Sequence, residues 1–233
     1  QMFQILTGIL LSYWALLWLG SKQGPFEIES NFARIFDILI LGESHLYRGF
    51  GIPFDPEGIL STIPSVGTVI IGYLMGGMLH TTKNYNDCVK RMFVFGFGLI
   101  VIGYLWGFIF PINKALWTSS YVLFTGGIAT IFLSTITYLI DIKHFKKPFW
   151  VFEVFGTNSI FIFILSGLWV KTIINIKREL NGEMTSAYNY LYKTIFVPLA
   201  GDVNGSLLFA ITHVIGFWLI LYWMYRKKIQ IKL

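Results

Sequence analysis

The sequence has few charged residues and a single cysteine. Only 13% of its 233 residues are charged, whereas 55% are hydrophobic, and the mean hydropathy is +0.65. This composition excludes a water-soluble domain with an ordinary polar surface. Because Cys88 has no second cysteine to pair with, an intrachain disulfide and a thiolate metal site are also excluded. We therefore predict a membrane protein without a metal centre.

Six stretches are long and apolar enough to cross a bilayer, which requires roughly 20 mostly apolar residues. We predict an all-α fold, a polytopic membrane helical bundle of about six transmembrane helices, with residues 1–233 as a single transmembrane domain. The long connections 21–59 and 171–204 predict two sizeable outer segments. The expected spans are about 2–20, 60–80, 92–110, 118–140, 149–170 and 205–225.

Basic residues concentrate in the connections expected on one side of the membrane. The connections around residues 83–91 and 141–147 and the C-terminal stretch together hold ten Lys or Arg against two acids, whereas the other three connections have a net charge of −1. The positive-inside rule then places both termini of this segment in the cytoplasm. Membrane topology explains the net charge of +6, so we expect the lipid bilayer as a partner and no nucleic acid. The predicted location is the cell inner membrane if the source is bacterial.

Two features stand out in the first outer segment. Apolar residues recur at helical spacing over residues 31–41, which predicts a short amphipathic helix on the outer surface. Asp55, Pro56 and Glu57 directly precede the second span, and Asp before Pro favours a helix start. We expect the helix to begin there and to bend or restart at Pro64. The two carboxylates fit either a capped helix end or a polar vestibule that holds a substrate.

Polar groups inside the spans are costly in a bilayer, so each carries a functional hypothesis. Asn158 and Ser159 belong to a Gly-Thr-Asn-Ser block in the fifth span, and His213 is expected at a depth similar to that of Asn158. Interhelical hydrogen bonding and a ligand path both explain these residues. His45 lies on the outer side, where a histidine can relay a proton or be incidental. Paired glycines in the spans predict close helix packing.

Four blocks of the sequence resemble the heparan-alpha-glucosaminide N-acetyltransferase family and its bacterial relatives. Their order and their positions at span ends extend over nearly the whole chain. The blocks are GESHLY at 42–47 with DPEGIL at 55–60, PINKALWTSSYV at 111–122, GTNS at 156–159, and YRKKI at 225–229.

The resemblance implies a multi-span enzyme that takes acetyl from cytoplasmic acetyl-CoA and delivers it to an amino sugar on the outer side. The family's catalytic histidine belongs to an amino-terminal motif that has no counterpart here. The catalytic residue is therefore unknown, and we do not assign that role to His45. We expect this chain to be the carboxy-terminal six-span portion of a longer protein, with the missing amino-terminal spans as its partner.

Placement and resemblance together nominate eight residues and leave two alternatives open. One alternative is a sugar or lipid-linked transporter without covalent chemistry, and the other is an inactive scaffold part of the acyltransferase. The acceptor sugar, the acyl group and a homodimer stay open as well. The candidates for substrate binding are His45, Asp55 and Glu57, and the candidates for the path of the acyl donor are Asn113, Trp117, Asn158, Ser159 and His213.

Overall fold

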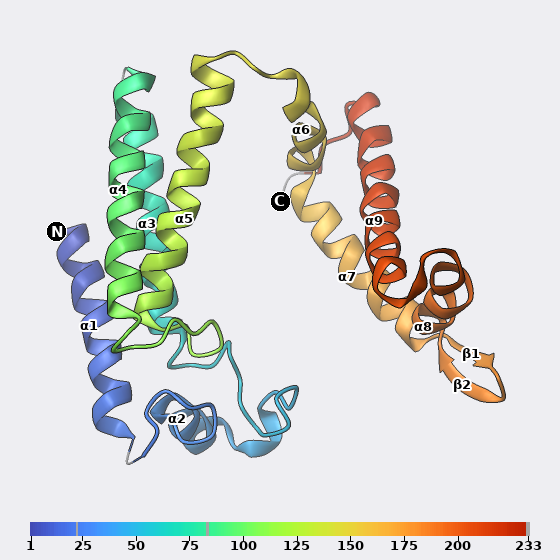
Figure 1. The fold of residues 1–233 in the computed structure, drawn as a ribbon, viewed down its shortest axis with the longest axis horizontal. Coiled ribbons are helices and arrows are strands. Elements are labelled where there is room, and N and C mark those ends of the chain that lie inside the picture. The colour runs from blue at the N-terminus through green and yellow to red at the C-terminus, as the bar shows by residue number, and fades with distance from the viewer. Residues whose placement is uncertain (22, 83, 232–233) are drawn as a thin grey trace. The chain divides into compact units, whose positions relative to one another are not determined.

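The computed structural model describes residues 1–21, 23–82 and 84–231. The chain divides into two compact units, Gln1–His144 and Phe145–Leu233, and both are mainly helical (Figure 1). Among the described residues, five helices are long and apolar enough to cross a membrane, or six if the bent pair α6 and α7 counts as one span. The predicted all-α, multi-span architecture is confirmed.

The first unit contains four long helices and one short helix. The short helix α2 lies at one end of the unit, while the last turn of α3, the first turn of α4 and the end of α5 lie at the opposite end (Figure 1). The helices are α1 (Met2–Gly20), α2 (Phe32–Leu41), α3 (Thr62–Thr81), α4 (Tyr85–Trp106) and α5 (Ser119–Thr137), with a 3₁₀ turn η1 (Glu43–His45) and a π turn η2 (Tyr138–Ile142).

We call the region formed by α2 and the connections 42–61 and 107–118 the α2 end of the first unit. The amphipathic helix predicted over residues 31–41 is confirmed here, because α2 begins after Asn31, whose side chain accepts a hydrogen bond from the Arg34 amide. Apolar residues from α1, α2 and the two connections pack beneath it. This cluster consists of Tyr13, Leu17, Ala33, Leu60 and Phe110.

Glycine allows α4 and α5 to pack backbone against backbone. A Cβ atom at Gly127 would lie 2.6 Å from the carbonyl oxygen of Gly96, and one at Gly103 would lie 2.6 Å from the Phe124 nitrogen. The predicted close packing at glycine is confirmed for this helix pair. Three other glycines have no neighbour within 4 Å of a Cβ position among the described residues, and for them close packing stays a prediction: Gly76, Gly77 and Gly167.

The second unit contains a broken span. α6 (Trp150–Thr157) and α7 (Ser159–Asn175) meet at Asn158 with a bend of 70°, so the stretch predicted as one span over 149–170 is not straight. α9 (Val197–Arg226) is kinked at Gly201, whose φ of 75° lies in the left-handed region that favours glycine. A 3₁₀ turn η3 (Lys147–Phe149) precedes α6.

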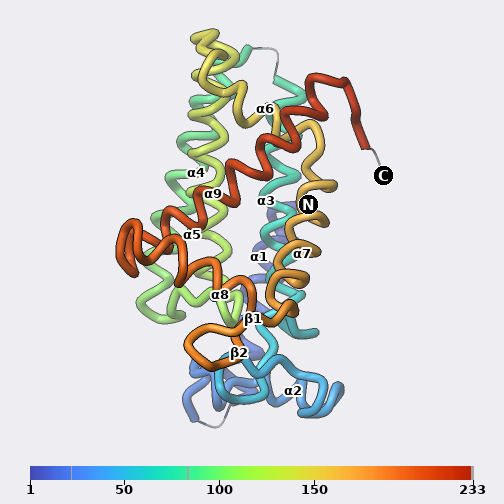
Figure 2. Tube along the Cα trace, turned by 90° about the vertical axis from the view of Figure 1, so that its right-hand side faces the viewer, coloured from blue at the N-terminus to red at the C-terminus, as the bar shows by residue number. Residues whose placement is uncertain are grey.

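A small β-hairpin follows α7, which the sequence analysis did not predict. β1 (Lys177–Leu180) pairs antiparallel with β2 (Glu183–Ser186) through a turn at Asn181 and Gly182, both with positive φ. The hairpin lies next to α8 (Ala187–Leu191), as Figure 2 shows. A π turn η4 (Tyr192–Phe196) connects α8 to α9.

Large apolar side chains are exposed along the spans of both units, for example Leu19, Phe163 and Val203. Contiguous apolar surface of this kind is rare on water-soluble proteins. Hydrocarbon chains of a bilayer cover such surface without loss, because they are themselves apolar. Together with the lengths of the helices, this exposure identifies an integral, multi-pass membrane protein.

Candidate functional site

A buried carboxylate lies at the α2 end of the first unit. Asp37 is only 2% exposed and follows the buried Ala33 by four residues, so the two share one face of α2. Its Oδ1 atom accepts hydrogen bonds from the backbone N–H groups of Ile59 at 3.1 Å and Leu60 at 3.4 Å. The carboxylate thereby ties α2 to the chain just before α3.

Burial raises the pKa of Asp37 above its ordinary value, because the charged form loses its hydration. The hydrogen bonds from Leu60 and Ile59 oppose this shift, while the negative charge of Asp55 adds to it. The net shift is upward, so Asp37 takes up a proton more readily than an exposed aspartate.

The raised pKa of Asp37 predicts a pH-dependent stability. Its contribution is fully present below the ordinary pKa of aspartate and is lost as the pH rises through the higher pKa of the folded state. The thermal midpoint of the purified protein should decline over that range. Asp37→Asn keeps an acceptor oxygen but cannot ionise, so the decline should disappear. Glu57→Gln, at an exposed carboxylate, should retain it, and an equal decline in all three proteins would exclude Asp37 as the cause.

Asp55 and Glu57 lie in a turn and not at a helix start. Asp55 Oδ1 accepts a hydrogen bond from the Glu57 amide at 2.9 Å, and the Asp55 carbonyl accepts one from Gly58 at 3.2 Å. The prediction that a helix begins at Asp55 is wrong, whereas the predicted restart of the helix near Pro64 is confirmed. α3 begins at Thr62, and Pro64 occupies its first turn, where its missing N–H has no helical partner to lose.

His45 lies in the exposed turn η1, next to the end of α2. Its Nδ1 atom is 2.8 Å from the Leu41 carbonyl oxygen and 3.2 Å from Ser44 Oγ. Since the carbonyl can only accept, Nδ1 donates to it, and Nε2 of the neutral ring is an acceptor. This geometry leaves one ring nitrogen of His45 for a substrate, and its binding role stays a prediction.

Asn113 and Trp117 shape the connection between α4 and α5, also at the α2 end. Asn113 Oδ1 accepts a hydrogen bond from the Ala115 amide at 2.8 Å. Trp117 has a φ of 50°, and its indole donates to Thr68 Oγ1 of α3 at 3.3 Å. A bulky residue with positive φ is strained and needs surrounding contacts to hold it. Both side chains therefore have structural partners, and their place on a donor path stays a prediction.

Asn158 occupies the bend between α6 and α7 and is 1% exposed. Its Nδ2 atom donates to the Ile229 carbonyl at 3.0 Å, and its Oδ1 atom accepts from the Ile231 amide at 2.9 Å. The side-chain amide therefore holds the chain that follows α9, using both its donor and its acceptor. Ser159, the next residue, is exposed at the start of α7.

Asn158→Asp should release the chain after α9. The new carboxylate oxygen would face the Ile229 carbonyl without a hydrogen atom between them, and losing that hydrogen bond costs about 1.5 kcal/mol. Trypsin should then cut at Lys227 and Lys228 about 10-fold faster than in the wild type. The matched control is Ser159→Ala, which should be cut at the wild-type rate. Unchanged cleavage of Asn158→Asp would contradict the conclusion that the Asn158 side chain holds the chain after α9.

His213 lies on α9 among aromatic rings. Its ring centroid is 4.5 Å from that of Phe209 and 6.3 Å from those of Trp169 and Tyr188, and its Nδ1 atom is 2.9 Å from the Phe209 carbonyl oxygen. Asn158 precedes Trp169 by eleven residues of the chain, or roughly 16 Å along α7. The structure therefore does not bring Asn158 and His213 into one site.

The chain is similar to curated proteins, although no protein-family model matches it. Heparan-alpha-glucosaminide N-acetyltransferase from Mus musculus is 30% identical over 151 residues, and the same is true of the enzyme of that name from Homo sapiens. The chain is thus similar to part of two acetyltransferases. In each case the similarity extends over 57% of this chain and 22% of the relative, so the chain spans about a fifth of the length of these proteins.

Asp37 is not among the eight residues nominated from the sequence. A signal was present, because Asp37 is the one acid in the apolar stretch 32–41 and falls on the same helical face as Ala33. The hydrogen-bond partners of Asp37 could not be predicted from the sequence. The partners of Asp37, Ile59 and Leu60, follow 22 and 23 residues later, and no periodicity links them to α2.

Proposed function

We propose that this chain is part of a membrane enzyme that moves acetyl from cytoplasmic acetyl-CoA to an amino sugar on the outer side of the membrane. The observation that carries the proposal is the 30% identity over 151 residues to two N-acetyltransferases of glucosaminide. The multi-span fold supports it, because a donor and an acceptor on opposite sides require a protein that crosses the bilayer.

Acetyl transfer to an amino sugar sets clear chemical demands. A C–N bond forms, the C–S bond of the thioester breaks, the CoA thiol leaves, and the ammonium group of the sugar must give its proton to a base. Hydrogen-bond donors must also stabilise the negative oxygen that develops on the acetyl carbon. In this proposal Asp55 receives or orients the ammonium group beside Asp37, and Glu57 extends the negative surface toward the sugar. The group that carries the acetyl is not assigned to this chain.

The double variant Asp55→Asn and Glu57→Gln should lower acetyl transfer by about 100-fold, which is the lower limit of the usual contribution of general acid–base catalysis. The protein should remain folded, because the turn at Asp55 keeps an acceptor oxygen. The matched control is Glu27→Gln and Glu29→Gln, which removes two exposed acids from the same outer segment. Unchanged turnover in the first variant would remove Asp55 and Glu57 from the mechanism.

A direct assay separates this proposal from a transporter. Proteoliposomes that contain the complete reading frame are given labelled acetyl-CoA and glucosamine. Labelled acetyl on the sugar supports the enzyme, whereas counterflow of unmodified glucosamine without acetylation supports a transporter. If the complete frame acetylates glucosamine and residues 1–233 alone do not, this chain is a scaffold that needs the rest of the protein.

A further inference from the structure

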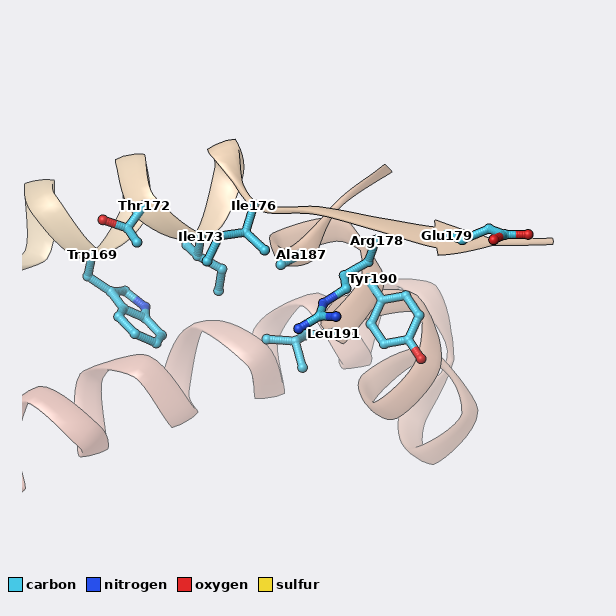
Figure 3. Close-up of a pocket in the computed structure, with 9 residues that line it drawn as sticks. All are labelled: Trp169, Thr172, Ile173, Ile176, Arg178, Glu179, Ala187, Tyr190 and Leu191. Carbon is cyan, nitrogen blue, oxygen red and sulfur yellow. The ribbon is translucent and has the colours of Figure 1, made fainter. Parts of the chain in front are cut away.

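Two adjoining hollows lie in the second unit. The hairpin pocket, about 630 Å³, is lined by residues of α7, β1 and α8, which Figure 3 shows. The aromatic groove, about 430 Å³, is lined by residues of α7, η4 and α9, including His213. Trp169 and Leu191 line both, so the two hollows meet at this pair. Each volume is in the range of small-molecule sites.

The aromatic groove is almost wholly apolar. Phe209 and Phe217 belong to its walls, and the two polar side chains among its lining residues bond to their own helix. Thr212 Oγ1 donates to the Leu208 carbonyl at 2.8 Å, and His213 Nδ1 lies 2.9 Å from the Phe209 carbonyl oxygen. Apart from His213 Nε2 and the Trp169 indole N–H, the lining residues offer a sugar or a nucleotide no side-chain replacement for its lost hydration. The groove therefore suits a hydrocarbon chain.

The hairpin pocket adds a positive charge to this apolar surface. Figure 3 shows the Arg178 side chain turned toward Leu191, whereas the carboxylate of Glu179 points away from it. Arg178 pairs through its backbone with Thr185 of β2. Within the described ranges its guanidinium has no hydrogen-bond or ion-pair partner. A guanidinium of this kind is well suited to bind a phosphate through two N–H donors.

Arg178 lies just beyond the end of a candidate span, where the phosphates of lipids are expected. α7 ends at Asn175 as the second half of the broken candidate span, and Arg178 follows three residues later. Arginines just beyond a span lie at the level of the head groups, where their charge remains hydrated. The apolar groove therefore corresponds to the acyl chain of a lipid, and the Arg178 guanidinium next to it corresponds to the phosphate.

We infer that the hairpin pocket and the aromatic groove form one binding site for a lipid whose head group carries a phosphate. The acyl chain occupies the aromatic groove, Trp169 and Leu191 contact the lipid where the two hollows meet, and Arg178 binds the phosphate. This site belongs to the second unit, whereas the acids at the α2 end belong to the first, and its proposed ligand does not depend on acetyl transfer.

Lipid binding can be measured by native mass spectrometry of the complete reading frame in detergent, without acetyl-CoA. The probes are phosphatidylglycerol and a diacylglycerol with the same chains but no phosphate. Arg178→Gln should weaken binding of phosphatidylglycerol by about 10-fold, because charge-assisted hydrogen bonds are lost. Diacylglycerol should bind the wild type about 10-fold more weakly than phosphatidylglycerol does, and Arg178→Gln should leave that weaker binding unchanged.

Two matched controls isolate each half of the site. Lys177→Gln removes the same charge from the neighbouring residue of β1, whose side chain points to the opposite face of the hairpin, and should change affinity less than about twofold. Gly216→Leu fills the aromatic groove, since a Cβ atom at Gly216 would meet no atom within 4 Å, and should weaken both probes. Gly167→Leu, equally open but outside both hollows, should weaken neither.

Three results would overturn the inference. Equal losses in Lys177→Gln and Arg178→Gln would indicate diffuse charge attraction, and equal affinity for the two probes would exclude phosphate recognition. Displacement of phosphatidylglycerol by soluble glycerol phosphate at the same concentration would assign Arg178 to a soluble ligand. Because the assay contains no acetyl-CoA, each of these outcomes leaves the proposed enzymatic function untouched.

Discussion

Gly127→Ala will separate α4 from α5 and destabilise the first unit. The new methyl group would lie 2.6 Å from the Gly96 carbonyl oxygen and 2.8 Å from the Ile100 nitrogen, and neither backbone atom can rotate away. Overpacking usually costs 1–3 kcal/mol, and contact with backbone favours the upper limit. We expect a loss of about 3 kcal/mol, which corresponds to a thermal midpoint about 6–12 °C lower in a protein of this size.

The matched control for Gly127→Ala is Gly98→Ala on α4. A Cβ atom at Gly98 would meet no atom within 4 Å, and alanine favours the helix by roughly 0.8–1.0 kcal/mol over glycine. Its thermal midpoint should therefore equal or exceed that of the wild type. If both variants have the same midpoint in a thermal melt of the purified protein, the close contact between α4 and α5 does not stabilise the fold.

Gly58→Ala will displace the buried carboxylate of Asp37. A Cβ atom at Gly58 would overlap Asp37 Oδ2. The carboxylate would have to leave the amides of Ile59 and Leu60, and unsatisfied buried amides cost about 1–3 kcal/mol. We expect a loss of about 2 kcal/mol in the free energy of unfolding and, if the acids at the α2 end bind the sugar, a fall in acetyl transfer as well.

A double-mutant cycle tests whether Gly58 acts through Asp37. Asp37→Ala removes the atom that the new methyl group would meet, so Gly58→Ala should cost less in that background. The interaction energy should lie between about 0.5 and 3 kcal/mol, as for residues in direct contact. If Gly58→Ala lowers the free energy of unfolding equally with and without Asp37, the substitution acts through the backbone at residue 58 and not through contact with Asp37.

Features set by local patterns were predictable from the sequence. The first span was expected at 2–20, and α1 is Met2–Gly20. The short helix at 31–41 was expected from its periodicity, and Asn31 caps it as a side chain of that type does. The hairpin turn at Asn181 and Gly182 is a strong local signal for a two-residue β-turn, and it was overlooked although the sequence contains it.

Features set by long-range contacts were not predictable. Asp55 and Pro56 are of the types that start a helix, but the Asp55 side chain accepts a hydrogen bond from the Glu57 amide within a turn. The Ile59 amide, shortly after this turn, donates to the distant Asp37. The Asn158 bend is held by residues more than 70 positions later. The polarity of Asn158 marked an unusual position inside a span, but only the fold supplies its partner.

The central proposal, acetyl transfer across the membrane, is tested most directly with sealed, inside-out vesicles that contain the complete reading frame. Glucosamine is trapped inside, on the side that corresponds to the outer face, and labelled acetyl-CoA is added outside. We expect labelled N-acetylglucosamine inside the vesicles, at a rate lowered about 100-fold by Asp55→Asn with Glu57→Gln. No labelled sugar, or label only when both substrates are outside, would contradict the account.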